Sequence, residues 1–137
     1  MSEASGNKAA SLRQGLLLVL SGPAGAGKST VLRTAVEGDP AVRFSVSCTT
    51  RPAREDEVDG IDYHFLSDDE FSAKLGGGEF LEHASVHKWR YGTLRASVID
   101  LIEEGFDVIM DIDIQGAEQI RACSDSLISR AHVDVFM

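Results

Sequence analysis

Apolar and polar segments alternate along this chain in a pattern that predicts a parallel α/β sheet. A continuous apolar run occupies 16–20, and 106–110 is apolar at every position except Asp107. Such runs are typical of strands that are buried on both faces of a parallel sheet. Helices are predicted over 28–37 and 94–104, which end before Gly38 and Gly105, and over 115–122. Buried strands that alternate with helices in this order predict an α/β fold with helices on both faces of the sheet.

The middle of the chain, about 47–93, is more polar and irregular and looks inserted into this framework. Its predicted elements are a charged loop at 53–60, an edge strand at 61–65, a helix at 68–75 and a strand at 80–86. Ser67 and Glu70 form a capping box that starts this helix. Outside the middle, β-like residues at 43–46 and an apolar segment at 132–137 predict further strands.

A glycine-rich motif follows the first apolar run and opens the first helix. It fits the phosphate-loop pattern G-x-x-x-x-G-K-[ST] and consists of Gly22, Pro23, Ala24, Gly25, Ala26, Gly27, Lys28, Ser29 and Thr30. Glycines let successive backbone N–H groups face phosphate oxygens, and the helix dipole favours the anion. Lys28 supplies charge for the β- and γ-phosphates, and the Ser29 hydroxyl is placed to bind Mg²⁺. The alternative is a simple turn with a solvated lysine, but the strand–loop–helix context favours binding of a nucleoside triphosphate.

Two acidic residues follow the second apolar run. Asp111 ends that strand, where its carboxylate can hold Mg²⁺ or one of its waters. Asp113 follows two residues later and is predicted to lie on the same face of the strand. A solvated strand end is the alternative, and the neighbouring phosphate loop favours the functional role.

The composition narrows the classes of protein that fit. The 137 residues allow one domain, and 13 Lys+Arg against 22 Asp+Glu give a net charge of −9. This acidic balance argues against nucleic-acid and anionic-membrane partners. Cys48 and Cys123 have no metal-ligand spacing, which argues against a zinc site or a disulfide framework. Residues 1–14 lack the apolar segment of a signal peptide and predict a disordered tail on a cytoplasmic protein.

Four further blocks of sequence resemble the guanylate kinase family. In order after the phosphate loop they are FSVSCTTRPAREDEVDGIDYHF, EFLEHA, RYGT and VIMDIDIQG. The resemblance covers 15–137 and implies a kinase of purine nucleotide metabolism that uses ATP and Mg²⁺ to convert GMP, and dGMP, to the diphosphate. It also implies a P-loop core at 15–46 and 94–137, with an inserted mixed α/β subdomain at 47–93 that binds GMP.

The resemblance assigns residues to the phosphate of GMP. These are Arg51, Arg54, Tyr63 and Tyr91. Arginine binds phosphate with two parallel hydrogen bonds, and phenol hydroxyls add further donors. With Lys28 and Mg²⁺, the two arginines are expected to spread the charge of the transferring phosphoryl group. Glu57 matches a family position in the charged loop without a defined role.

The resemblance also assigns residues to the guanine base. These are Ser47, Glu82 and Thr93, with Asp113 on the GMP side. The Glu82 carboxylate can accept from the adjacent N1–H and N2–H of guanine, whereas adenine presents an acceptor at N1. Glu82 would therefore exclude AMP. Either Ser47 or Thr93 can donate to O6.

Family members continue beyond the equivalent of 132–137 with an arginine-rich lid, an adenine-contacting segment and C-terminal helices. We therefore expect these 137 residues to bind nucleotides but to turn over slowly. Two alternatives stay open. One is a guanylate-kinase-like module that binds protein partners without nucleotide chemistry, and the other is a kinase for another small acceptor. The oligomeric state is not fixed by the sequence.

Overall fold

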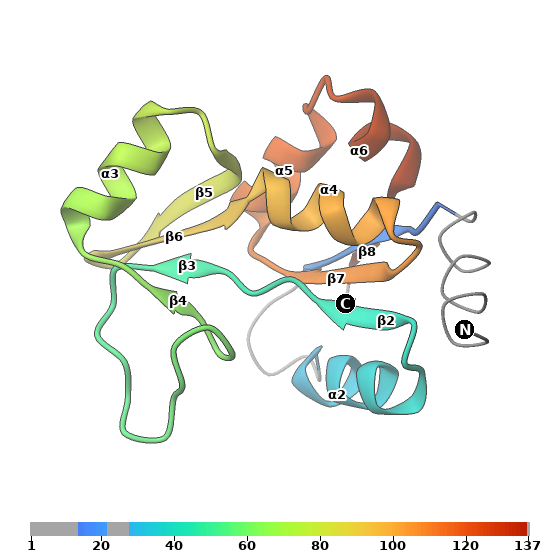
Figure 1. The fold of residues 1–137 in the computed structure, drawn as a ribbon, viewed down its shortest axis with the longest axis horizontal. Helices are drawn as coiled ribbons and strands as arrows, with labels where there is room; N and C mark the ends of the chain where they lie inside the picture. The colour runs from blue at the N-terminus through green and yellow to red at the C-terminus, as the bar shows by residue number, and fades with distance from the viewer. Residues whose placement is uncertain (1–13, 22–27, 137) are drawn as a thin grey trace, which may run out of the picture.

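The computed structural model describes residues 14–21 and 28–136. In it, two four-stranded sheets lie side by side (Figure 1). The first sheet, of order β2-β7-β1-β8, consists of β1 (Leu17–Ser21), β2 (Val42–Phe44), β7 (Asp107–Asp111) and β8 (His132–Phe136). The second, of order β4-β3-β6-β5, consists of β3 (Cys48–Thr49), β4 (His64–Phe65), β5 (Phe80–Val86) and β6 (Trp89–Leu94). The helices are α2 (Lys28–Gly38), α3 (Asp68–Gly76), α4 (Arg95–Glu103), α5 (Ile114–Arg121) and α6 (Ser126–Ala131).

Every strand pair in the first sheet is parallel. Successive residues of β1 point to opposite faces of this sheet. Leu17 and Val19 pack with residues of α4, α5 and α6, whereas Leu18 and Leu20 pack with residues of α2. Helices therefore cover both faces, which confirms the predicted α/β sheet (Figure 1).

The second sheet is mixed and packs against α3. Strands β3 and β4 are parallel, and β6 pairs antiparallel with both β3 and β5. Its core contains Cys48, Phe71 and Phe80, and the two phenyl rings stack with centroids 4.5 Å apart. The predicted capping box is present, since Ser67 and Glu70 each accept from the other's backbone N–H.

Two predictions for this sheet were incomplete. Of the predicted edge strand at 61–65, His64 and Phe65 form β4 and Tyr63 forms an isolated bridge with Asp59, whereas Ile61 and Asp62 turn back on Val58 through backbone and carboxylate hydrogen bonds. Strand β6 was not predicted. The turn before it contains His87 with φ of 56° rather than the glycine or asparagine that usually marks a tight hairpin.

The predicted position of Asp113 on a strand face was wrong. This residue does not lie on a strand face but is the N-cap of α5, where its carboxylate accepts from the Gly116 N–H at 2.9 Å. The short helix α6, capped by Asp125, was also not predicted. None of the helices in the described part of the chain is long and apolar enough to cross a membrane.

Candidate functional site

A buried carboxylate lies on the β5–β6 hairpin. Glu82 and Thr93 are register partners on these strands, and they are 5% and 0% exposed. The Thr93 hydroxyl donates to Glu82 Oε2 at 2.7 Å. Burial raises the pKa of Glu82, and the nearby Asp113 raises it further, whereas the Thr93 hydrogen bond lowers it. Because a buried carboxylate is costly, its retention here points to a ligand that offers hydrogen-bond donors.

Glu82 opens onto a cavity of about 290 Å³ where the second sheet meets the carboxyl end of β7. The structure brings six of the predicted site residues to this cavity: Ser47, Tyr63, Glu82, Tyr91, Asp111 and Asp113. Among the described residues, Ala84, Val86 and Ile112 also line it. None of these three was predicted as a site residue, although strand alternation places Ala84 and Val86 on the same face of β5 as Glu82. A mixed lining of this kind suits a small ligand with one planar apolar part and several polar groups.

An arginine and a glutamate are paired in the loop beside this cavity. Arg51 donates to both carboxylate oxygens of Glu57, at 2.8 and 2.9 Å. The two side chains are only 11% and 14% exposed. The hydrogen bonds from Arg51 are the main reason why the pKa of Glu57 falls to about 2, and the same pairing raises the pKa of Arg51. The sequence predicted no acidic partner for Arg51, because the two residues are joined by a loop rather than by helical spacing.

Arg51 also lies against the two tyrosines that line the cavity. Its guanidinium carbon is 5.3 Å from the centre of the Tyr63 ring, and the Tyr63 and Tyr91 ring centroids are 6.0 Å apart. The predicted phosphate ligands Arg51, Tyr63 and Tyr91 thus form one cluster. The fourth, Arg54, is exposed and does not line the cavity, and its backbone N–H donates to Glu57 at 2.8 Å.

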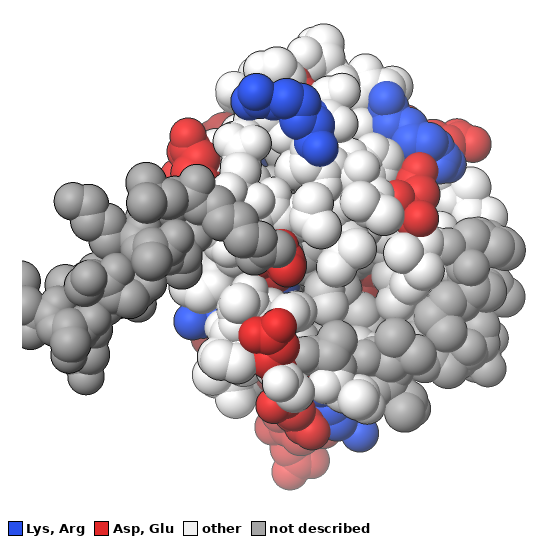
Figure 2. All heavy atoms as spheres, turned by 90° about the vertical axis from the view of Figure 1, so that its right-hand side faces the viewer, with Lys and Arg blue, Asp and Glu red and all other residues white. Residues whose placement is uncertain are grey.

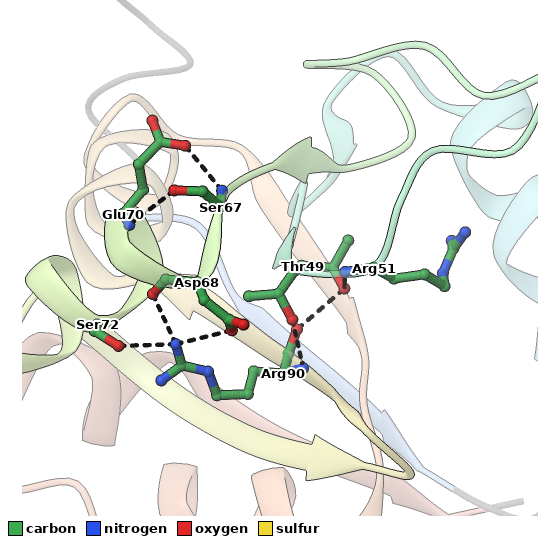
Figure 3. A network of polar contacts seen from close by, with 8 residues as sticks. Thr49, Arg51, Ser67, Asp68, Glu70, Ser72 and Arg90 are labelled. Carbon is green, nitrogen blue, oxygen red and sulfur yellow. Dashed lines mark hydrogen bonds and ion pairs between the residues drawn. The ribbon is translucent and has the colours of Figure 1, made fainter.

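Strand β6 is held in place by its other side chains. Arg90 donates to the Asp68 carbonyl and to the Ser72 hydroxyl at the start of α3, each at 2.8 Å (Figure 3). The Thr49 hydroxyl links the strands, since it donates to the Arg90 carbonyl and accepts from the Arg51 N–H. The Arg51 side chain points away from this network (Figure 3). These bonds fix the strand that carries Tyr91 and Thr93.

The predicted phosphate loop is only partly described. Gly22, Pro23, Ala24, Gly25, Ala26 and Gly27 lie outside the described residues, as do the side chains of Lys28, Ser29 and Thr30. The described backbone of α2 begins at Lys28, seven residues after the last residue of β1, Ser21. Asp111 pairs with Leu20 on β1 and is therefore at the edge of the sheet from which the loop departs. Asp111 also lines a second cavity of about 420 Å³ beside α2. It therefore lies between this cavity and the one that contains Glu82.

The described residues include no group of three His, Cys, Asp or Glu side chains that could hold a metal ion by themselves. A magnesium ion does not require such a group, because it commonly takes one or two protein oxygens and completes its shell with phosphates and waters. The face in Figure 2 carries Lys and Arg in small separate groups, with Asp and Glu nearby. Arg51 is a cation beside the cavity, where it is paired with Glu57.

The described residues form a parallel α/β sheet covered by helices on both faces, with a second, mixed sheet beside the carboxyl end of β7. A family model described as guanylate kinase matches residues 14–130. This chain belongs to the guanylate kinase family.

Several named relatives are similar over most of this chain. A guanylate kinase from Cereibacter sphaeroides is 50% identical over 91% of this chain and 58% of its own length. One from Rhodopseudomonas palustris is 51% identical over 83% of this chain and 52% of its own length. A crystal structure of guanylate kinase from Anaplasma phagocytophilum has a TM-score of 0.71 and 32% identity, and covers 90% of this chain and 59% of that one. This chain spans rather more than half the length of these relatives.

Proposed function

We propose that this chain transfers the γ-phosphate of ATP to GMP and so forms GDP and ADP. The observation that carries the proposal is the buried Glu82 carboxylate, which is held by Thr93 at the wall of a nucleotide-sized cavity. Residues 47–93 would then bind GMP, and the core, which consists of residues 15–46 and 94–137, would bind ATP. The names and sequences of the relatives support the same activity.

The guanine base would be read by Glu82 and Ser47. The carboxylate accepts from N1–H and N2–H, and it opposes the acceptor at N1 of adenine. A threonine hydroxyl has one hydrogen to donate, and Thr93 donates it to Glu82. Of the two hydroxyls considered for O6, Ser47 is therefore the donor that we propose. Asp113, at the same cavity, stays a proposed contact to the GMP side.

The phosphate of GMP would lie at the other end of the cavity, near Arg51, Tyr63 and Tyr91. The guanidinium presents donors in a planar fork that matches phosphate oxygens, and the two phenols add single hydrogen bonds. Arg54 is proposed as a second cation that joins this cluster when the anion is bound. Glu57 holds Arg51 in place before the ligand arrives, at 2.8 and 2.9 Å.

The triphosphate of ATP would be held by the glycine-rich motif and Lys28. The residues present fit a magnesium ion, because Ser29 and Asp111 offer the oxygen ligands that it prefers and Asp111 ends a strand beside the loop. When bound, Mg²⁺ would neutralise charge on the β- and γ-phosphates. The protein side chains would align the two nucleotides, because phosphoryl transfer depends on positioning and charge more than on a covalent intermediate. We also propose a cytoplasmic location, where ATP and GMP are available.

Single-turnover chemistry tests this proposal even if turnover is slow. The chain, in excess over ATP radiolabelled at its γ-phosphate and with Mg²⁺, is mixed with GMP, dGMP, AMP or UMP, and the products are separated by ion-exchange chromatography. We expect labelled GDP and dGDP, and no labelled product from AMP or UMP. Labelled product from AMP or UMP would indicate another acceptor, and titrations in which neither GMP nor ATP binds would favour a protein-interaction module.

A further inference from the structure

The first turn of α5 lies directly against the Glu82 carboxylate. Gly116 is buried in that turn, and a Cβ atom added to it would collide with Glu82 Oε1. The same Cβ would lie 3.3 Å from Glu82 Cδ and 3.2 Å from the end of the Ile112 side chain. The side chain that this position lacks would therefore fall where the carboxylate now lies.

Space, and not backbone conformation, explains the glycine. The glycines with positive φ among the described residues are Gly60, Gly78 and Gly105, and Gly116 is not one of them. It sits in a regular helical turn, and its N–H already donates to the N-cap Asp113. Any residue can adopt this backbone, whereas only glycine leaves room for Glu82.

The helix cannot easily move away to make room. One turn after Gly116, the Gln119 side chain bonds to both backbone polar groups of His83, which is the residue after Glu82. Its amide donates to the His83 carbonyl at 2.6 Å, and its oxygen accepts from the His83 N–H at 3.0 Å. On the same helix Ile120 is fully buried in the core. Helix α5 is thus fastened to β5 beside the carboxylate.

We propose that Gly116 is a specificity-determining positioning residue. Its missing side chain leaves the room in which the Glu82 carboxylate is held in one fixed position, facing the guanine base. This inference rests on the proposed function, because it names what holds the base-reading group of that site. With α5 held by Gln119 and Oε2 held by Thr93, a methyl group at Gly116 displaces the carboxylate rather than the helix. The displaced carboxylate no longer faces N1–H and N2–H together.

The test compares Gly116→Ala with Gly76→Ala. Gly76 ends α3, has no atom within 4 Å of an added Cβ and lies away from the cavity, so it controls for the general effect of alanine in a helix. Each variant is titrated with GMP and with IMP, which lacks the N2 amine. We expect Gly116→Ala to weaken GMP binding by about tenfold or more and IMP binding by less, because small misplacements of a functional group are costly. Gly76→Ala should bind both ligands as the unmodified chain does.

A second comparison, made in the Glu82→Ala variant, distinguishes displacement of the Glu82 carboxylate from a general loss of folding stability. In Glu82→Ala the group that Gly116→Ala would strike is gone, so adding Gly116→Ala should change GMP affinity and the urea midpoint by little. If Gly116→Ala alone does not fold, the double variant should fold, and its failure to fold would overturn the inference. Equal GMP affinity for Gly116→Ala and the unmodified chain would also overturn it. No GMP binding by the unmodified chain would instead contradict the proposed function itself.

Discussion

Replacing Thr93 by valine removes one hydroxyl group from the centre of the site and almost nothing else. Thr93 is fully buried, and valine has nearly the same shape, so the packing around β6 should be retained. The hydroxyl donates to a carboxylate that is only 5% exposed, at 2.7 Å. Hydrogen bonds to charged groups contribute about 1.5–3 kcal/mol. We therefore expect Thr93→Val to lower the free energy of unfolding by about 2 kcal/mol at pH 8.

The effect should depend on pH with a defined sign. The pKa of Glu82 is raised by burial, and the Thr93 hydrogen bond counters this by favouring the ionised form. Without that bond the pKa rises further, so the ionised carboxylate is more costly to fold at high pH. As the pH falls through the raised pKa, the carboxyl is protonated in both proteins. The difference in unfolding free energy should then shrink toward the value of a neutral hydrogen bond, about 1 kcal/mol.

Urea denaturation followed by far-ultraviolet circular dichroism, repeated in steps from pH 8 downward, measures both quantities. Thr93→Ser is the matched control, because it keeps the donor and loses only a methyl group. Its difference from the unmodified chain should not depend on pH. A Thr93→Val variant within about 0.5 kcal/mol of the unmodified chain at pH 8, the range of an ordinary surface substitution, would refute the reasoning.

Three further predictions concern the charged groups of the site. Arg51→Lys should weaken GMP binding by about tenfold in calorimetric titrations and leave guanosine binding unchanged, since an ammonium cannot replace the planar fork at a phosphate. The difference in unfolding free energy between the unmodified chain and Glu57→Gln should be largest above pH 5 and should disappear toward pH 2, because the pKa of Glu57 falls from 4.5 to about 2 on folding. GMP affinity should fall as the pH drops through the raised pKa of Glu82, and the Glu82→Gln variant should show only the titration of the GMP phosphate, with its pKa of about 6.

Each of these three predictions can be contradicted by a specific result. Equal loss of GMP and guanosine binding in Arg51→Lys would place the arginine at the base or in the fold instead of at the phosphate. A stability difference for Glu57→Gln that is constant from pH 7 to pH 2 would mean that the pairing with Arg51 does not form in solution. Parallel pH profiles for the unmodified chain and Glu82→Gln would show that the carboxylate does not contact the ligand.

The elements with strong local patterns were predictable from the sequence. The run at 16–20 is apolar throughout because β1 is covered by helices on both faces, and this pattern is visible in any single sequence. The capping box at Ser67 and Glu70 is a local signal of the same kind. Strand β6 was missed because its position depends on hydrogen bonds with distant residues, such as the Thr49 hydroxyl that donates to Arg90 and the Thr50 hydroxyl that accepts from it, rather than on an alternating pattern.

The candidate site shows the same division. The residues proposed to contact a base and a phosphate could be found from four blocks of the sequence. The structure brings three of them, Glu82, Tyr63 and Tyr91, to one cavity. Which groups pair with one another could not be found in this way. The Thr93 bond to Glu82 and the Arg51 pairing with Glu57 depend on how a hairpin and a loop fold back, and sequence spacing does not encode those distances. The space left by Gly116 depends on the approach of a helix to a strand from another part of the chain.

The central claim is that the Glu82 carboxylate selects guanine, and calorimetric titration of GMP and AMP tests it most directly. Because a site built around a buried polar group strongly rejects a ligand that leaves that group unpaired, we expect GMP to bind the unmodified chain at least about 100-fold more tightly than AMP. In Glu82→Gln most of that preference should be lost. Equal affinities for GMP and AMP in the unmodified chain, or an unchanged preference in Glu82→Gln, would contradict the account.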